Sequence, residues 1–281
     1  MTFLHALWHY PFLQIVMLAG LASAVASGVV GPLVVSRRIA FMAGGIAHSV
    51  LGGLGIAHWL GAPPLLGALL AAVVSALLIA FASLRARENE DMLIGALWAV
   101  GMAIGIIALA QAPGYSVNLM SYLLGSLMMA TRDQVVLMLG LNALMLGLLW
   151  LSYRPLMATL FDPEFAALRG VPTGLLYSGF LVVVALAVVV LVYTVGLVMV
   201  MALVTLPAAT ARLGTARLPA MMLAASGAAM LAVVLGLAVA YAGDTPAGAT
   251  IVLCAALLYL AGLLIRHLAQ RQRRHTQPKG P

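Results

Sequence analysis

The stretch RRIAFMAGGIAHSVLGGLGIAHWL, residues 37–60, begins with two arginines and continues as an almost wholly apolar, glycine-rich run with His48 near its middle. Read as a helix, it aligns small side chains in adjacent rows. Rows of small residues let neighbouring backbones approach closely inside a membrane. We therefore expect a membrane-spanning helix that packs against its neighbours through Gly44, Gly45, Ser49, Gly52 and Gly53.

His48 lies on one of these rows, between Gly44 and Gly52. An imidazole at such a position faces protein or a water-filled path rather than lipid. It could handle a metal ion or a proton on a conduction route, or it could simply hydrogen-bond to a neighbouring helix. The residues alone leave both interpretations open.

The composition indicates an all-α polytopic membrane protein. Of 281 residues, 64% are hydrophobic and only 7% are charged, and the mean hydropathy is +1.15. Too little polar surface is available to cover a soluble core, and apolar runs near the length of a bilayer span recur along the chain. The net charge of +7 lies at the ends of these runs, which indicates a lipid bilayer and no nucleic acid as a partner. The single cysteine, Cys254, excludes an intrachain disulfide and a multi-cysteine zinc site.

The apolar runs predict eight or nine transmembrane helices. We expect an interfacial N-terminus over 1–12, a transmembrane domain over 13–268 and a basic cytoplasmic tail over 269–281, with the basic segment after residue 265 disordered. Residues 175–211 are too long for one span and barely long enough for two, so a reversal near 193–196 stays an open question. The segment 119–131 is too short to span and is re-entrant or interfacial. The expected spans are 13–35, 37–60, 65–84, 92–110, 133–151, 175–211, 219–240 and 249–265, with a polar segment over 152–172.

If the breaks between spans alternate, every Lys and Arg except Arg132 falls on one side of the membrane. The positive-inside rule makes that side cytoplasmic. We therefore expect a cytoplasmic C-terminus and an N-terminus that faces outward.

Residues 161–170, FDPEFAALRG, carry the signals of a short cytoplasmic helix over about 162–169. Asp162 can cap the first backbone N–H groups, Pro163 suits the first turn, and Gly170 can adopt the left-handed conformation that ends a helix. An exposed helix with an aromatic side chain is typical of a plug for a partner's groove, and a connector helix lying on its own membrane domain is the alternative. The residues we assign to docking are Phe161, Asp162, Glu164, Phe165, Leu168 and Gly170.

The chain lacks the means to use ATP itself. Its one lysine, Lys279, lies near the C-terminus, so no G-x-x-x-x-G-K-[ST] phosphate loop is possible. We therefore expect no enzyme activity and no cofactor in this chain, with any ATP bound by another polypeptide. All seven acidic residues lie at span ends or in loops, which argues against an ion-coupled secondary carrier. Ser49 directly follows His48 and cannot form a catalytic pair with it on a helix, so an intramembrane enzyme is the least favoured alternative.

Five segments, in order, resemble permease subunits of bacterial zinc, manganese and iron ABC importers. They are RRIAFMAGGIAHSVLGG (37–53), EDMLIGALWAVGMAIGI (90–106), SYLLGSL (121–127), FDPEFAALRGV (161–171) and VGLVMVMALVTLPAATARL (195–213). The resemblance implies a homodimeric pore in the bacterial inner membrane, with a cytoplasmic ATP-binding cassette ATPase under each subunit. It also implies an extracytoplasmic metal-binding protein that delivers the ion, and it makes 161–170 the coupling helix to the ATPase.

The resemblance also places His48 on the metal path and gives the glycine rows a second interpretation, as the wall of a narrow pore. The family motif is commonly written with an acid four residues before this histidine, and here that position is Gly44. His48 therefore has a different partner or acts alone. Because imidazole suits zinc and manganese prefers oxygen ligands, the missing acid favours zinc as the transported ion over manganese, iron or a metal chelate.

Overall fold

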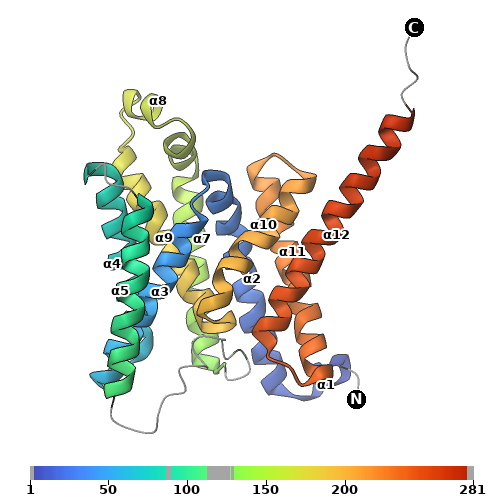
Figure 1. Ribbon diagram of the computed structural model, residues 1–281, viewed down its shortest axis with the longest axis horizontal. Helices are drawn as coiled ribbons and strands as arrows, with labels where there is room; N and C mark the ends of the chain where they lie inside the picture. The colour runs from blue at the N-terminus through green and yellow to red at the C-terminus, as the bar shows by residue number, and fades with distance from the viewer. Residues whose placement is uncertain (1–2, 87–89, 113–126, 128–129, 277–281) are drawn as a thin grey trace.

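The computed structural model describes residues 3–86, 90–112, 127 and 130–276, and all the regular structure in these residues is helical (Figure 1). The first half of the chain holds α1 (Phe3–His9), α2 (Pro11–Arg37), α3 (Ala40–Trp59), α4 (Pro64–Phe81), the π-helical turn η1 (Ala82–Ala86) and α5 (Glu90–Gln111). The second half holds α7 (Arg132–Phe161), α8 (Pro163–Leu168), α9 (Thr173–Val195), the 3-10 turn η3 (Leu197–Met199), α10 (Val200–Gly214), α11 (Leu218–Gly243) and α12 (Ala247–Thr276).

The long helices form two groups joined by a central pair. Helices α3, α4 and α5 pack together on one side, and α2, α10, α11 and α12 pack together on the other (Figure 1). Helices α7 and α9 lie between the groups; α9 contacts α3 and α4 on one side and α2 on the other, and α7 packs against α9 and α2. The short helix α8 lies at one end of the bundle, with the C-terminus beyond the same end and the N-terminus at the opposite end (Figure 1).

The expected number of spans is confirmed. Eight of the described helices are long and apolar enough to cross a membrane, and α10 is a shorter apolar helix. The open question over 175–211 is resolved by a reversal. Helix α9 ends at Val195, Gly196 adopts a φ of +89° that favours glycine, and α10 runs back toward the end that carries α8 (Figure 1).

Two helices run beyond the ends of the spans that we expected. Helix α7 runs to Phe161 through Pro155, although the expected span ends at 151 and a polar segment follows it. Helix α12 runs to Thr276, although we expected disorder after residue 265. In both places polar residues mark the end of the span but do not end the helix. The tail has no glycine or proline before Pro278, and its Arg, Gln, Leu and Ala are good helix formers. The expectation for 119–131 falls almost entirely outside the described residues.

Close backbone contacts and a few polar bonds hold the spans together. Gly28 of α2 faces the Ser226 backbone of α11, and Gly31 of α2 faces the Val204 carbonyl of α10. Hydrogen bonds also join α2 to α9 and α7, and α4 to α3. They are Ser23 Oγ to Thr194 Oγ1 at 2.6 Å, Asn142 Nδ2 to the Ala22 carbonyl at 2.9 Å, and Ser75 Oγ to Ser49 Oγ at 2.6 Å. Such contacts matter in a bilayer because lipid tails give helices no hydrophobic reason to associate.

Candidate metal path and coupling helix

The glycine rows of α3 lie where α3 meets its two neighbours. A Cβ atom on Gly52 would stand 2.9 Å from the Gly101 carbonyl oxygen of α5, and one on Gly45 would stand 2.5 Å from Ile94 Cγ2. Gly53 faces the Gly67 carbonyl oxygen of α4 on the other side. The glycines thus permit close backbone approach within one protomer, and their role as a pore wall stays a prediction.

Ser49 lies in the same tightly packed region. Its Oγ donates to the Ile46 carbonyl at 2.7 Å and accepts from Ser75 Oγ of α4 at 2.6 Å. A Cβ on Gly101 of α5 would stand 2.5 Å from Ser49 Cα. The Ser49 hydroxyl therefore both donates and accepts a hydrogen bond within the packed helices.

His48 is buried, with 8% of its surface exposed. Its ring stacks on the indole of Trp98 from α5, with the ring centroids 3.9 Å apart and the planes 17° apart. Its Nδ1 has no hydrogen-bond partner among the described residues. Most buried polar atoms in proteins have a partner, so an open imidazole nitrogen marks a position where a ligand can bind.

The position of the missing acid is filled by side chains from two other helices. A Cβ atom on Gly44 would stand 2.7 Å from Met201 Sδ of α10 and 2.9 Å from Trp98 Cζ3 of α5. The sequence reasoning singled out neither Trp98 nor Met201. Both lie in segments that carry the family resemblance, but no spacing along the chain indicates that they meet beside His48.

The described part of the chain contains no cluster of three or more His, Cys, Asp or Glu side chains that could hold an ion. The acidic side chains that the structure describes are all exposed: Asp91, Asp133, Asp162, Glu164 and Asp244. A small number of protein ligands is compatible with conduction, because the ion must be bound weakly enough to leave.

Helix α8 is closed at both ends by local hydrogen bonds. Asp162 Oδ1 accepts from the backbone N–H of Phe165 at 3.0 Å. At the other end, Gly170 has a φ of +75°, and its N–H donates to the Ala167 carbonyl at 2.9 Å. The Val171 N–H donates to the Ala166 carbonyl at 3.0 Å, which completes a Schellman motif.

The outer face of α8 is apolar and open. Phe165 is 50% exposed and Leu168 is 87% exposed, and Phe161 just before the helix is also exposed. Ala166 is buried and anchors α8 to the bundle. The Arg169 guanidinium lies 5.1 Å from the centroid of the Phe165 ring. The arrangement is a small helix with two large apolar side chains pointing away from the membrane-spanning helices.

Helix α8 is also tied to the rest of the bundle. Nη1 of Arg37, the last residue of α2, donates to the carbonyl of Leu160 near the end of α7. Leu160 lies just before the start of α8. This bond holds the C-terminal ends of α2 and α7 together next to α8.

The model of a family described as the ABC 3 transport family matches residues 9–266. The chain belongs to this family. A membrane protein of Synechocystis sp. is 38% identical over 92% of each chain. The manganese transport system membrane protein MntC of Halalkalibacterium halodurans is 33% identical over 92% of this chain and 88% of its own. Among solved structures, PsaBC from Streptococcus pneumoniae in complex with Fab matches with a TM-score of 0.84 and 28% identity, over 92% of this chain and 94% of that chain.

The resemblance to metal ABC permeases is therefore confirmed, and the chain is the permease of a metal ABC importer. The all-α, polytopic architecture is confirmed by the same match. The identity of the metal is a separate question.

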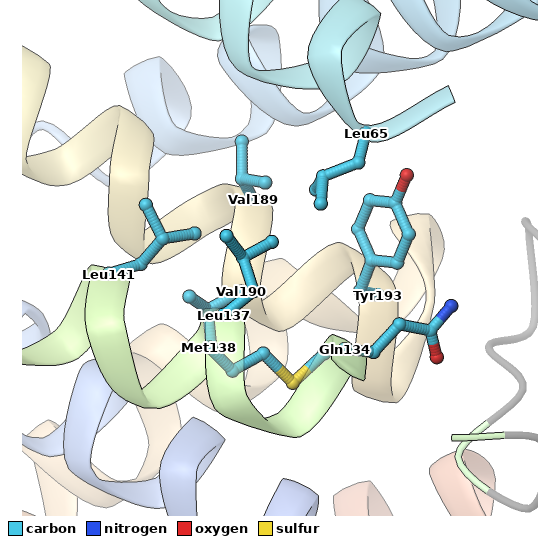
Figure 2. A pocket seen from close by; sticks show the side chains of 8 residues that line it. All are labelled: Leu65, Gln134, Leu137, Met138, Leu141, Val189, Val190 and Tyr193. Atoms are coloured by element: carbon cyan, nitrogen blue, oxygen red, sulfur yellow. The ribbon is translucent and has the colours of Figure 1, made fainter. Parts of the chain in front are cut away.

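Figure 2 shows a small pocket of this permease, away from His48, where Leu65 of α4 lies over α7 and α9. Its walls are apolar, and Gln134 and Tyr193 lie together at one end of it. Among its lining residues no imidazole, thiol or carboxylate is present. It therefore does not supply the ligands expected for a divalent ion.

Proposed function

We propose that the chain is the translocation subunit of an ATP-driven importer that carries Zn²⁺ across the bacterial inner membrane. Two copies form the pore, a cytoplasmic ATP-binding cassette ATPase docks under each copy, and an extracytoplasmic binding protein delivers the ion. The chain itself has no enzymatic activity, because ATP is hydrolysed in the ATPase subunit.

One observation carries the assignment of zinc. His48 is buried with its Nδ1 unpartnered, while the carboxylates that the structure describes are exposed. Imidazole is a good ligand for Zn²⁺, whereas Mn²⁺ prefers carboxylate, carbonyl and water oxygens. A single imidazole also binds more weakly than a closed site of four protein ligands, and weak binding suits passage of the ion. High affinity then resides in the binding protein.

The arrangement of helix ends supports the orientation. The α2–α3 connection, η1, α8, the α10–α11 connection and the C-terminal end of α12 all lie at one end of the bundle (Figure 1). Arg37, Arg38, Arg85, Arg169 and Arg217 belong to these segments, and Arg132 begins α7 at the opposite end. The positive-inside rule makes the α8 end cytoplasmic and the N-terminus extracytoplasmic.

Coupling is assigned to α8. Phe165 and Leu168 form an exposed apolar face on a helix that both caps hold rigid. A rigid helix needs little further ordering when it enters a partner's groove, so it can transmit the movement of an ATPase cleft.

Manganese is the second candidate. It is favoured by the name of the Halalkalibacterium halodurans relative, a manganese transport system membrane protein. Backbone carbonyl oxygens or waters along the path would then replace carboxylates as the hard ligands.

The test is uptake of radiolabelled zinc by the complete transporter in proteoliposomes, with unlabelled Zn²⁺, Mn²⁺ or Fe²⁺ as competitor. We expect ATP-dependent uptake of labelled zinc. An excess of unlabelled Zn²⁺ should suppress it, and the same concentration of Mn²⁺ or Fe²⁺ should not. If Mn²⁺ suppressed uptake as strongly as Zn²⁺ does, the assignment of zinc as the transported ion would be overturned in favour of manganese. Uptake that continues without ATP, driven by an ion gradient, would overturn the importer assignment.

A further inference from the structure

We propose that Met201 is a specificity-determining residue of the metal path, and that its thioether contacts the passing ion beside His48. The pair selects borderline and soft divalent cations, represented by Zn²⁺ and Cd²⁺, against the hard Mn²⁺. The inference rests on the proposed function, in which the path carries a divalent metal and His48 is its ligand. Met201 is added here as a second ligand.

The first support is the position of the sulfur. Met201 Sδ lies 2.7 Å and Met201 Cε lies 3.1 Å from the place where a Cβ of Gly44 would be. Gly44 and His48 are four residues apart on α3, and such residues are neighbours on one helix face. The absence of a side chain at Gly44 therefore makes room for the thioether one turn away from the imidazole.

The second support is that the same small space is closed by Trp98. Its ring stacks on His48 with a centroid distance of 3.9 Å, and its Cζ3 lies 2.9 Å from the Gly44 Cβ position. The indole covers one face of the imidazole, so an ion reaches the ring nitrogens only at the ring edge. His48 Nδ1 is buried there without a partner among the described residues.

The third support is the backbone around Met201. Helix α9 ends at Val195, Gly196 has a φ of +89°, and one 3-10 turn precedes α10, which starts at Val200. Irregular backbone within a membrane protein is tolerated where it is buried in protein or lines a cavity, and broken helices recur at transport sites. Met201 is the second residue of the returning helix, so this break sets its place beside α3.

Methionine is often apolar filler, and the alternative is that Met201 only packs. Met42 and Met145 show that role here, since they are 2% and 1% exposed within the core. Met201 differs because it is only partly buried and its sulfur lies at Gly44, one helical turn from the buried His48 imidazole. A thioether is a soft, uncharged ligand, so it discriminates against Mn²⁺ without binding Zn²⁺ so tightly that the ion stays.

The experiment compares Met201→Leu with Met230→Leu in the complete transporter. Leu replaces Met with little change in volume and removes the sulfur. Met230 is also partly buried but lies on α11, away from His48, so it is the matched control. Radiolabelled zinc uptake is measured with Cd²⁺ or Mn²⁺ as competitor, after equal membrane levels and equal co-purification of the ATPase have been verified.

In Met201→Leu we expect Cd²⁺ to compete about tenfold less well, which is the typical size of a lost interaction at a metal site. Competition by Mn²⁺ should be unchanged or stronger, and Met230→Leu should match the wild type. A competition profile of Met201→Leu identical to wild type would overturn the inference while leaving zinc transport by the wild type intact. Failure of the wild-type transporter to carry zinc would instead overturn the proposed function.

X-ray absorption of the wild-type transporter loaded with Cd²⁺ decides the question even if Met201→Leu does not assemble. We expect a sulfur neighbour of the bound ion, and we expect its loss in Met201→Leu where that variant assembles. A shell of nitrogen and oxygen alone around the wild-type ion would overturn the assignment of Met201.

Discussion

Helices α3 and α8 differ in what determines their functional surfaces. In α8, the Asp162 cap and the Schellman motif at Gly170 are made by residues within one short segment, and they leave an open apolar face. In α3, the side chains near His48 come from other helices: Trp98 of α5 stacks on its ring, and Met201 of α10 lies at Gly44, one turn away. A docking surface can thus be built locally, whereas a conduction site inside a bundle depends on where distant helices meet.

The two regions should fail differently when they are changed. A change in α8 should disturb binding of the ATPase and leave the membrane bundle intact. A change in the packing of α3 should disturb the bundle itself. The following predictions test this separation, from the largest expected effect to the smallest.

Phe165→Asp places a charge on the exposed apolar face of α8, where Phe165 is 50% exposed in the isolated chain. If this side chain is a central anchor of the docking surface, its loss weakens ATPase binding by roughly 2 kcal/mol or more, about thirtyfold. Co-purification of the ATPase and ATP-driven uptake measure the effect. Phe165→Leu is the control and should keep most of the binding. Equal recovery of the ATPase with Phe165→Asp would contradict docking at α8.

Gly53→Ala adds a methyl group where α3 meets the Gly67 carbonyl and the Ala71 side chain of α4. Overpacking of this kind costs about 1–3 kcal/mol, because the two helices must move apart. The thermal unfolding temperature in detergent measures the loss. Gly147→Ala is the matched control, since nothing lies within 4 Å of a Cβ at Gly147, and it should be neutral or slightly stabilising. Equal stability of the two variants would count against close packing at Gly53.

Asp162→Ala removes the cap of α8, whose Oδ1 accepts the Phe165 N–H at 3.0 Å. The loss of such a cap costs about 1 kcal/mol, so α8 should fray and ATP-driven uptake should fall only partly. Asp162→Ser should restore most of the uptake, because serine also caps well. If Asp162→Ser were as impaired as Asp162→Ala, the carboxylate would have a role other than capping.

Ser75→Ala removes the hydrogen bond between Ser75 and Ser49, which lie 2.6 Å apart on α4 and α3. Bonds of this kind between membrane helices average about 0.6 kcal/mol. Ser49 keeps its bond to the Ile46 carbonyl, so the effect should be small. A double-mutant cycle with Ser49→Ala measures the coupling energy by thermal unfolding. A coupling energy of zero would mean that the bond does not stabilise the contact.

The contrast between the two helices also explains what could be predicted from the sequence. Helix α8 was predicted with its caps, because Asp162, Pro163 and Gly170 act on their immediate neighbours. The spans and the burial of His48 followed from hydropathy and from its row of small residues. The side chains around Gly44 and His48 could not be predicted, because Trp98 and Met201 reach α3 only through the packing of α5 and α10 on it.

Helix ends were the other difficulty. Polar residues after 151 and after 265 indicated where two of the expected spans end, and after 265 we also expected disorder. The backbone continues as helix beyond both points, to Phe161 and to Thr276. Hydropathy indicates whether a segment lies in lipid or in water. A helix, by contrast, ends where a capping residue, a glycine or a proline stops it.

The most direct test of the account is zinc uptake by His48→Ala in the complete transporter, measured together with recovery of the ATPase. We predict that uptake is lost while the ATPase still co-purifies at the wild-type level, because the proposed role of His48 is on the ion path and α8 is untouched. Wild-type zinc uptake at a normal membrane level would contradict the role of His48 and with it the proposed path.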